Sequence, residues 1–179
     1  MKKSITFFLL LFTLSVIPAS FVFASSYNQG IYNENVPYGS ATYLAISTDG
    51  DISIPVTPTS TGTQVTGTSH VTVTSTDVVG YKLYLRSSSS TNMDNLGDTL
   101  PTSANVSPAA LSMDTWGYNT DGSSNFVGSS LTDTLIRTFT GPAPTGDITT
   151  VTYGMKVDLA KPAGNYTTAV VYTAAPDTD

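Results

Sequence analysis

The chain contains no cysteine and has little of the chemistry on which enzymes rely. Its 179 residues include one histidine, His70, and one glutamate, Glu34. Small exported proteins often use disulfides as staples, and this chain has none available. Its fold must therefore depend on its core, on a bound ion or on neighbouring subunits. The absence of cysteine suits export from a cell without a strong oxidising system, such as one of the Gram-positive type.

Basic side chains are scarce as well. Two of the seven, Lys2 and Lys3, belong to the first residues, so the chain after residue 24 carries five basic against 13 acidic side chains, a formal charge of −8. Such a surface repels nucleic-acid phosphates and anionic lipid head groups. We predict no nucleic-acid partner, whereas neutral glycans, cationic partners and divalent ions are compatible with this charge.

Only one long apolar run occurs, from Phe7 to Ile17, and it is shorter than the ~20 residues that a membrane span requires. Lysines precede it, and the triplet 22–24 (Val-Phe-Ala) follows as a cleavage site with small residues at its ends. These features predict a secretory leader over residues 1–24 with Ser25 as the first mature residue; the alternative is an uncleaved anchor. The mature protein is then secreted, extracellular or at the cell surface, with no membrane span.

No window shows a sustained helical period, whereas alternation of period two recurs along the chain. It predicts half-buried strands rich in β-branched and aromatic residues, with Tyr81 and Tyr153 on inward faces. The expected strands cover residues 42–47, 52–56, 70–74, 79–86, 134–139, 151–158 and 166–174. Short strands at this spacing predict an all-β fold, an antiparallel immunoglobulin-like β-sandwich, with a closed β-barrel as the alternative.

The chain divides into the leader, an N-terminal arm over residues 25–40 and a single β-sandwich domain over residues 41–179. Residues 48–51 (Thr-Asp-Gly-Asp) predict a tight hairpin turn, and residues 161–165 predict the turn that joins the last two strands. The Thr- and Gly-rich stretch 57–69 is expected to be a loop between strands.

Catalytic arrangements find little support. A Ser-His-Asp triad needs a base that is oriented by an acid and lies close to a nucleophile. We expect His70 to be a surface residue at a strand end, and Asp77, seven residues later, forms no recognisable motif with it. Carboxylates near turns, such as Asp49 and Asp51, are expected to bond to nearby backbone amides instead of forming a glycosidase pair. We predict that the protein is not an enzyme and that it has no catalytic residues.

A calcium site is the one metal site that the residues suggest. Hard cations take carboxylate and carbonyl oxygens from loops. Four candidate ligands surround Trp116: Asp114, Asn119, Asp121 and Asn125. Their spacing matches neither the EF-hand loop nor a nonapeptide repeat, so plain solvation of a loop is the alternative.

Tyrosines crowd the N-terminal arm. Tyr27, Tyr32 and Tyr38 would offer rigid apolar area with a polar tip to a sugar ring or a protein partner. Trp116, the single tryptophan, is expected to be buried. We also predict no internal Lys–Asn isopeptide bond, because Lys82 and Lys156 fall on the expected wet faces of their strands.

Three patches of the sequence resemble secreted surface domains. They are residues 70–85, the motif 115–118 (Thr-Trp-Gly-Tyr), and residues 151–176, which include Pro-Ala-Gly-Asn-Tyr-Thr before the closing strand. Together they resemble bacterial cell-surface β-domains of the WxL-like and pilin-like types. Val171-Tyr172-Thr173 and Trp116-Gly117-Tyr118 replace the two Trp-x-Leu signatures, so the resemblance implies a non-enzymatic surface role without peptidoglycan binding of the WxL kind.

These observations predict a structural or adhesive protein of the bacterial cell surface that can serve as a subunit of a pilus-like fibre. Its partners would be other copies of itself or other surface proteins, joined through the arm 25–40 or the closing strand 166–174, because sheet edges accept additional strands. The alternatives are a carbohydrate-binding module and an unrecognised secreted hydrolase.

Overall fold

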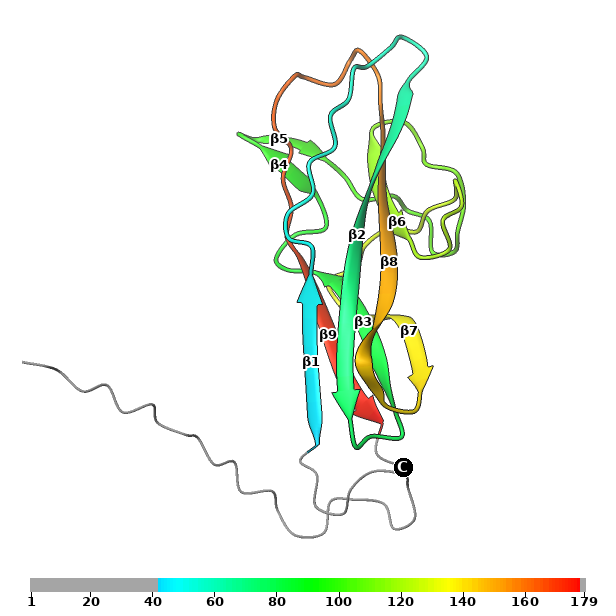
Figure 1. Cartoon of the computed structure of the whole chain (residues 1–179). Coiled ribbons are helices and arrows are strands. Elements are labelled where there is room, and N and C mark those ends of the chain that lie inside the picture. Colours follow the sequence, from blue (N-terminus) through cyan, green and yellow to red (C-terminus); the bar gives the residue numbers. More distant parts are fainter. Residues whose placement is uncertain (1–41, 178–179) are drawn as a thin grey trace, which may run out of the picture.

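The computed structural model describes residues 42–177, and nine β-strands make up the regular structure of this part. Within these residues no α-helix occurs, and so none that could cross a membrane. The strands are β1 (Tyr43–Thr48), β2 (Thr63–Thr76), β3 (Gly80–Ser87), β4 (Met93–Asn95), β5 (Asp98–Leu100), β6 (Thr115–Asn119), β7 (Thr134–Thr140), β8 (Ala143–Val157) and β9 (Val170–Asp177) (Figure 1).

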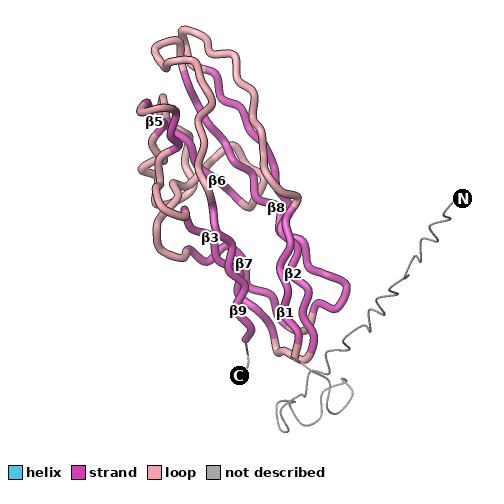
Figure 2. Tube along the Cα trace, turned by 90° about the vertical axis from the view of Figure 1, so that its left-hand side faces the viewer, coloured by secondary structure: helices cyan, strands magenta, loops and turns pink. Residues whose placement is uncertain are grey.

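The strands form two main sheets in which all pairings are antiparallel. One sheet has the order β1-β2-β8-β6, the other has the order β7-β3-β9, and β4 and β5 form a separate hairpin. Figure 2 shows the two sheets as separate layers over the lower half of the molecule. The antiparallel all-β prediction is confirmed, and the sheets make a sandwich-like pair. The closed barrel is wrong, because no ladder within residues 42–177 joins the two sheets.

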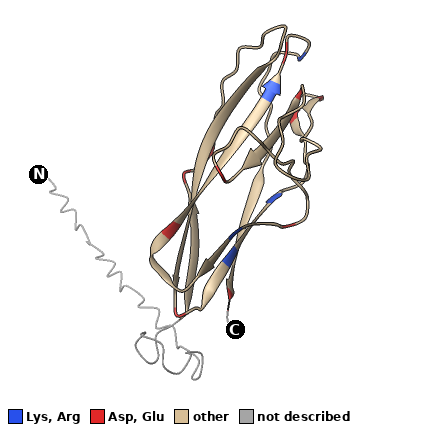
Figure 3. Cartoon of the chain, turned by 90° about the vertical axis from the view of Figure 1, so that its right-hand side faces the viewer, with Lys and Arg blue, Asp and Glu red and all other residues tan. Residues whose placement is uncertain are grey.

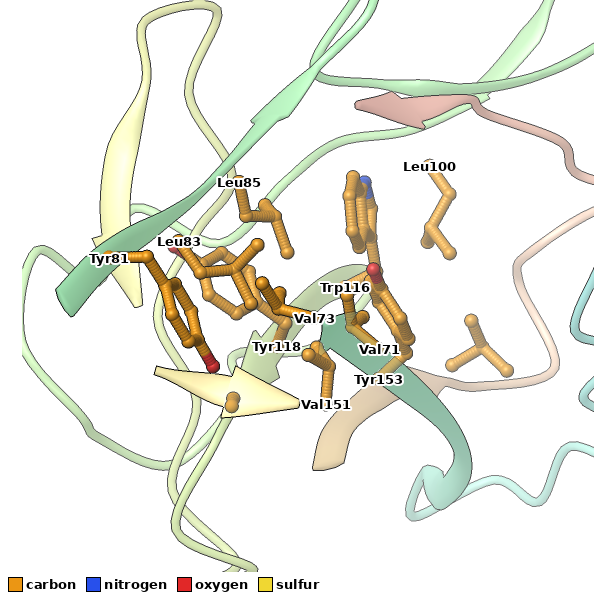
Figure 4. Packing of buried hydrophobic residues seen from close by; sticks show 12 residues of the cluster. Val71, Val73, Tyr81, Leu83, Leu85, Leu100, Trp116, Tyr118, Val151 and Tyr153 are labelled. Carbon is orange, nitrogen blue, oxygen red and sulfur yellow. The ribbon is translucent and has the colours of Figure 1, made fainter. Parts of the chain in front are cut away.

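Alternation places apolar side chains between the layers. In β3, Tyr81, Leu83 and Leu85 are fully buried, whereas the residues between them are half-buried on the other face. Facing them are Val71 of β2 and Tyr153 of β8 (Figure 4). These inward faces form one continuous core, so the predicted faces of the strands around residues 79–86 and 151–158 are confirmed.

The predicted hairpin at residues 48–51 does not form. β1 pairs instead with the distal half of β2, with Tyr43 opposite Thr76 and Thr48 opposite Val71. The expected strand 52–56 is extended and alternates between half-buried and exposed residues, but it pairs with no strand in the described part of the chain. Hydrophobic periodicity defines which residues face inward but not which segment is the hydrogen-bonded neighbour.

The stretch 57–69, expected to be a loop, supplies the first half of β2. Residues Thr63–Ser69 pair with Val151–Val157 of β8. Threonine suits a strand because it is β-branched. Gly67 fits as well, since a Cβ at this position would lie 2.8 Å from an atom of Ile54 and 2.9 Å from an atom of Ile52.

The last two strands are not a hairpin either. Residues 158–169 connect β8 to β9, and these strands belong to different sheets. The connection therefore crosses from one layer to the other. Figure 1 shows it beside the upper halves of β2 and β8, together with the segment 49–62.

Charged side chains are sparse and scattered over the surface. Figure 3 shows isolated blue and red positions separated by large uncharged areas. Four ion pairs occur among the described residues, and each has at least one partner that is well exposed. Charge therefore builds no focused binding surface in this part of the chain.

Candidate functional site

The candidate site is a groove of about 360 Å³ between the two layers, beyond the end of β1. Its volume lies at the lower end of the ~300–1,000 Å³ found for ligand pockets. One wall is the segment 48–54, and the opposite wall is residues 168–172, where the chain enters β9. The full lining is Thr48, Gly50, Asp51, Ile52, Ile54, Ser69, Met93, Trp116, Tyr153, Thr168, Ala169, Val170 and Tyr172.

Aromatic residues of three strands line the groove. Trp116 of β6 is fully buried, and its Nε1 donates a hydrogen bond to the carbonyl oxygen of Thr91 at 2.9 Å. The rings of Trp116 and Tyr153 lie 6.5 Å apart (Figure 4). The hydroxyls of Tyr153 on β8 and Tyr172 on β9 form a hydrogen bond that joins the two layers. The expectation that Trp116 is buried is confirmed.

The groove holds little charge. Burial raises the pKa of the Tyr153 hydroxyl, and burial likewise raises the pKa of Tyr172, so both are neutral at physiological pH. Asp51 is the one charged residue of the lining, and it is exposed. The groove is therefore suited to uncharged, largely apolar groups.

Two of the three aromatic residues of the groove offer no face to a sugar ring. A pyranose requires an accessible aromatic face, but Trp116 is 0% exposed and Tyr153 only 7%, so the half-buried Tyr172 is the one aromatic residue of this lining with accessible area. The tyrosines predicted to contact a ligand, Tyr27, Tyr32 and Tyr38, lie outside the described residues. The carbohydrate-binding alternative rests on them and stays a prediction.

The first wall of the groove has unpaired backbone. Within residues 42–177, no backbone N–H or C=O group of residues 51–56 makes a hydrogen bond. Ile52, Ile54 and Val56 pack against the core, and the residues between them are exposed. The segment is thus a strand by burial but has no neighbour in a sheet.

The second wall has an unpaired edge too. The amide of Ser88 donates to the carbonyl of Ala169 at 2.8 Å, in the same register that pairs β3 with β9. Backbone groups alternate in direction along a strand, so those of residues 169, 171 and 173 point toward β3. Those of Thr168, Val170 and Tyr172 point away from it. Among the described residues, β3 is the only strand that pairs with β9.

The predicted calcium ligands do not all come together. Asn119 is buried at the end of β6, where its side-chain amide donates to the carbonyls of Ser123 and Asn125. Asp121 accepts a hydrogen bond from the Ser123 amide, which lowers the pKa of Asp121. Three of the four residues thus share one turn, 119–125.

Asp114 precedes β6 and therefore lies at the opposite end of that strand from this turn. A five-residue strand is ~16 Å long, so one ion cannot bind at both of its ends. Among residues 42–177, no three His, Asp or Glu side chains form a group that could hold a metal ion. The calcium site stays a prediction, restricted to the turn 119–125.

His70 lies within β2 and not at a strand end as expected. Its Nδ1 is 2.7 Å from Oδ2 of Asp49, and this hydrogen bond is the main reason that the pKa of Asp49 is lowered. About half of each side chain is exposed. In the described part of the chain, no serine or threonine hydroxyl bonds to His70, so the pair has no nucleophile of the kind that a triad requires.

The lysines for which the structure gives contacts are not in the core. Lys82 pairs with Asp177 at 3.1 Å, and both side chains are about 40% exposed. Lys161 donates to the carbonyl oxygen of Thr99. These are surface contacts, in keeping with the expectation that Lys82 lies on a wet face.

Comparisons of the chain with protein-family models, with curated proteins and with solved structures give no match. The resemblance to WxL-like and pilin-like domains therefore stays a prediction from sequence.

Sequence analysis did not find the groove. Its walls come from segments more than 100 residues apart, and only the alternation at residues 52–56 and 166–174 was visible. That Thr168, Val170 and Tyr172 present an unpaired edge follows from the crossover of residues 158–169, which carries no local signal.

Proposed function

We propose that this chain is an exported, non-enzymatic structural or adhesive protein of the bacterial cell surface, and that copies of it join into a pilus-like fibre. In this proposal the two sheets correspond to an immunoglobulin-like β-sandwich over residues 41–179, and residues 1–24 direct export. Its partners are other copies of the chain or other surface proteins.

The observation that carries the proposal is the open edge of β9. An unpaired strand edge is a template for pairing with another chain, and proteins commonly cover such edges. This fold covers the edge of β6, where Trp116 bonds to residues 101 and 103 and Tyr118 bonds to Val127. The edge of β9 has no such cover among the described residues, which favours association through β-strand addition.

The length of the central strands supports a scaffold role. β2 has 14 residues and β8 has 15, and they pair along most of their length. At ~3.3 Å per residue each strand is ~45–50 Å long. Figure 1 shows that this pair runs through almost the full height of the described fold. In such a pair, the covalent backbone of each strand bears tension along its length, and the hydrogen bonds between the strands resist sliding.

The test uses the mature chain from Ser25 in sedimentation velocity and negative-stain electron microscopy, together with fractionation of the cells that make it. We expect concentration-dependent oligomers, fibres and surface-exposed material that protease removes from intact cells. A strict monomer at all concentrations, found only inside the cell, would contradict the proposal.

A further inference from the structure

The second layer of the fold has an unfilled position. Its strands follow in the order β7-β3-β9, and the segment 51–56 lies beyond β9 across the groove. Ile54 on one wall and Val170 on the other both pack against the same core and both line the groove. The two facing backbones are unpaired, so the groove has the form of a sheet from which one strand is missing.

We infer that this groove accepts a β-strand from the N-terminal segment 25–40 of a second copy of the chain. The inference rests on the proposed function and names the contact through which the fibre would form. The incoming strand would exchange hydrogen bonds with the backbone of Thr168, Val170 and Tyr172, and its alternate side chains would enter the groove.

The facing wall has one edge along which no proline interrupts the backbone donors. Successive residues of a strand point their backbone groups to opposite edges. In the segment 51–56, one edge therefore carries the groups of Ile52, Ile54 and Val56, each with an N–H donor. The other edge includes Pro55, which has none. One edge of this segment thus offers an uninterrupted row of donors and acceptors.

The segment 25–40 suits the groove in charge and in length. It has one charged residue, Glu34, and it carries the apolar or aromatic side chains of Tyr27, Ile31, Tyr32 and Val36. The groove has only Asp51 as a charged lining residue. Extended, 16 residues span ~53 Å, which exceeds the ~17 Å of a five-residue edge from 168 to 172.

A second copy is the better donor because of where β1 begins. The described chain enters the fold at Tyr43, and Thr48, at the other end of β1, is the first residue that reaches the groove. To fill its own groove, the segment would have to reverse direction and run back along β1. Donation to a neighbour requires no reversal, and this head-to-tail contact leaves a free segment and a free groove at the two ends of the chain of subunits.

Because the chain has no cysteine, an introduced cysteine is the only thiol that a cross-linker can modify. Mature chains with cysteine in turn at Ile31, Tyr32 or Val36 are mixed with a chain carrying Thr168→Cys and treated with a short bismaleimide. We expect mixed dimers whose linked peptides join the two sites. The control partner carries Val106→Cys, which is fully exposed and outside the groove. Yields no higher than with this control for all three positions would overturn the inference.

The same reagents distinguish a strand donated by a second copy from a strand donated by the segment 25–40 of the same chain. Chains that carry both cysteines would cross-link within one chain, at a yield independent of concentration, if each segment filled its own groove. That result would overturn donation between copies. Cross-linking that rises with concentration and falls when excess synthetic peptide 25–40 is added supports it.

A proline variant tests the backbone pairing. Val170→Pro removes an N–H that points into the groove, and Pro176 already occupies the same edge of β9. We expect the unfolding transition to be retained and self-association to weaken roughly tenfold. Val170→Thr keeps the N–H and should retain association. If Val170→Pro does not fold, cross-linking of the Thr168→Cys chain still tests whether the groove binds the segment 25–40.

Failure of this inference differs from failure of the proposed function. If Val170→Pro still forms fibres and no cross-links to Thr168→Cys are found, the groove is not the contact between copies. The proposal of a self-assembling surface protein would then stand. If cross-links to the groove are found but the chain forms only dimers and never reaches the cell surface, the groove is the contact between copies. The proposed function as a fibre subunit would then be contradicted.

Discussion

Replacing Asp147 with alanine should destabilise the fold more than any other removal of a charged side chain in the described residues. Asp147 is on β8, and its side chain is 14% exposed. Its carboxylate accepts a hydrogen bond from the Tyr81 hydroxyl of β3 at 2.5 Å and two from Arg137 of β7, at 3.0 and 2.9 Å. One carboxylate therefore links the two layers.

The magnitude follows from what each partner loses. Tyr81 is fully buried, and without Asp147 its hydroxyl has lost its acceptor, which costs about 1–3 kcal/mol. The side chain of Arg137 is 41% exposed and regains water, so its ion pair adds only about 0–1 kcal/mol. We expect Asp147→Ala to lower the free energy of unfolding by about 1–4 kcal/mol.

Urea unfolding followed by fluorescence measures this loss, because Trp116 is the single tryptophan and is fully buried. The matched control is Asp133→Ala. Asp133 also pairs with an arginine, Arg86 at 3.4 Å, but both side chains are more than a third exposed. Its removal should cost less than ~1 kcal/mol. Equal losses in the two variants would refute the reasoning that burial of Asp147 and Tyr81 decides the cost.

Three further changes have defined outcomes. Gly154→Ala places a methyl group 2.6 Å from two ring atoms of buried Phe126 and should cost about 1–3 kcal/mol in urea unfolding; an unchanged midpoint would show that the ring moves freely. Leu96 is fully exposed, with φ 51° in the two-residue turn of the β4–β5 hairpin, so Leu96→Asn should stabilise the fold by about 0.5–1 kcal/mol; a loss would mean that Leu96 has a packing role. Because burial raises the pKa of Tyr153 and Tyr172, their contribution to stability is complete below the ordinary tyrosine value of about 10 and declines as pH rises above it. Melting temperature should therefore fall above pH ~10, less steeply in Tyr153→Phe, and an equal slope in both proteins would contradict this assignment.

Sequence patterns predicted the strands whose alternation is strong. In β3 and in the second half of β8, large apolar residues recur at every second position, and all of them except the half-buried Met155 are buried in the structure. Burial of Tyr81, Tyr153 and Trp116 followed because large aromatic residues contribute most to a core.

Pairing could not be predicted in the same way. Residues 52–56 and 63–69 have comparable β character, yet only the second segment joins a ladder. The difference depends on β8, which lies some 80 residues further along and pairs with residues 63–69 but not with residues 52–56. β6 was not predicted as a strand, because it has only five residues and includes Gly117, so its alternation is too short to recognise. It nevertheless contributes Trp116 to the core.

The candidate site was predicted least. Contact between His70 and Asp49 depends on β1 lying beside β2, which the expected hairpin at residues 48–51 excluded. The groove depends on the crossover from β8 to β9, which leaves the edge at Val170 unpaired. Such features arise from the order of strands in space, and alternation within one strand carries no information about it.

Residue-resolved amide hydrogen exchange along β9 tests the central claim most directly. In dilute protein, the amides of Val171 and Thr173 should exchange slowly because they point toward β3, whereas those of Thr168, Val170 and Tyr172 should exchange fast. As concentration rises and copies associate, protection should appear at the second set. Protection at both sets in the dilute monomer, or none at the second set in the assembled protein, would contradict the open-edge account.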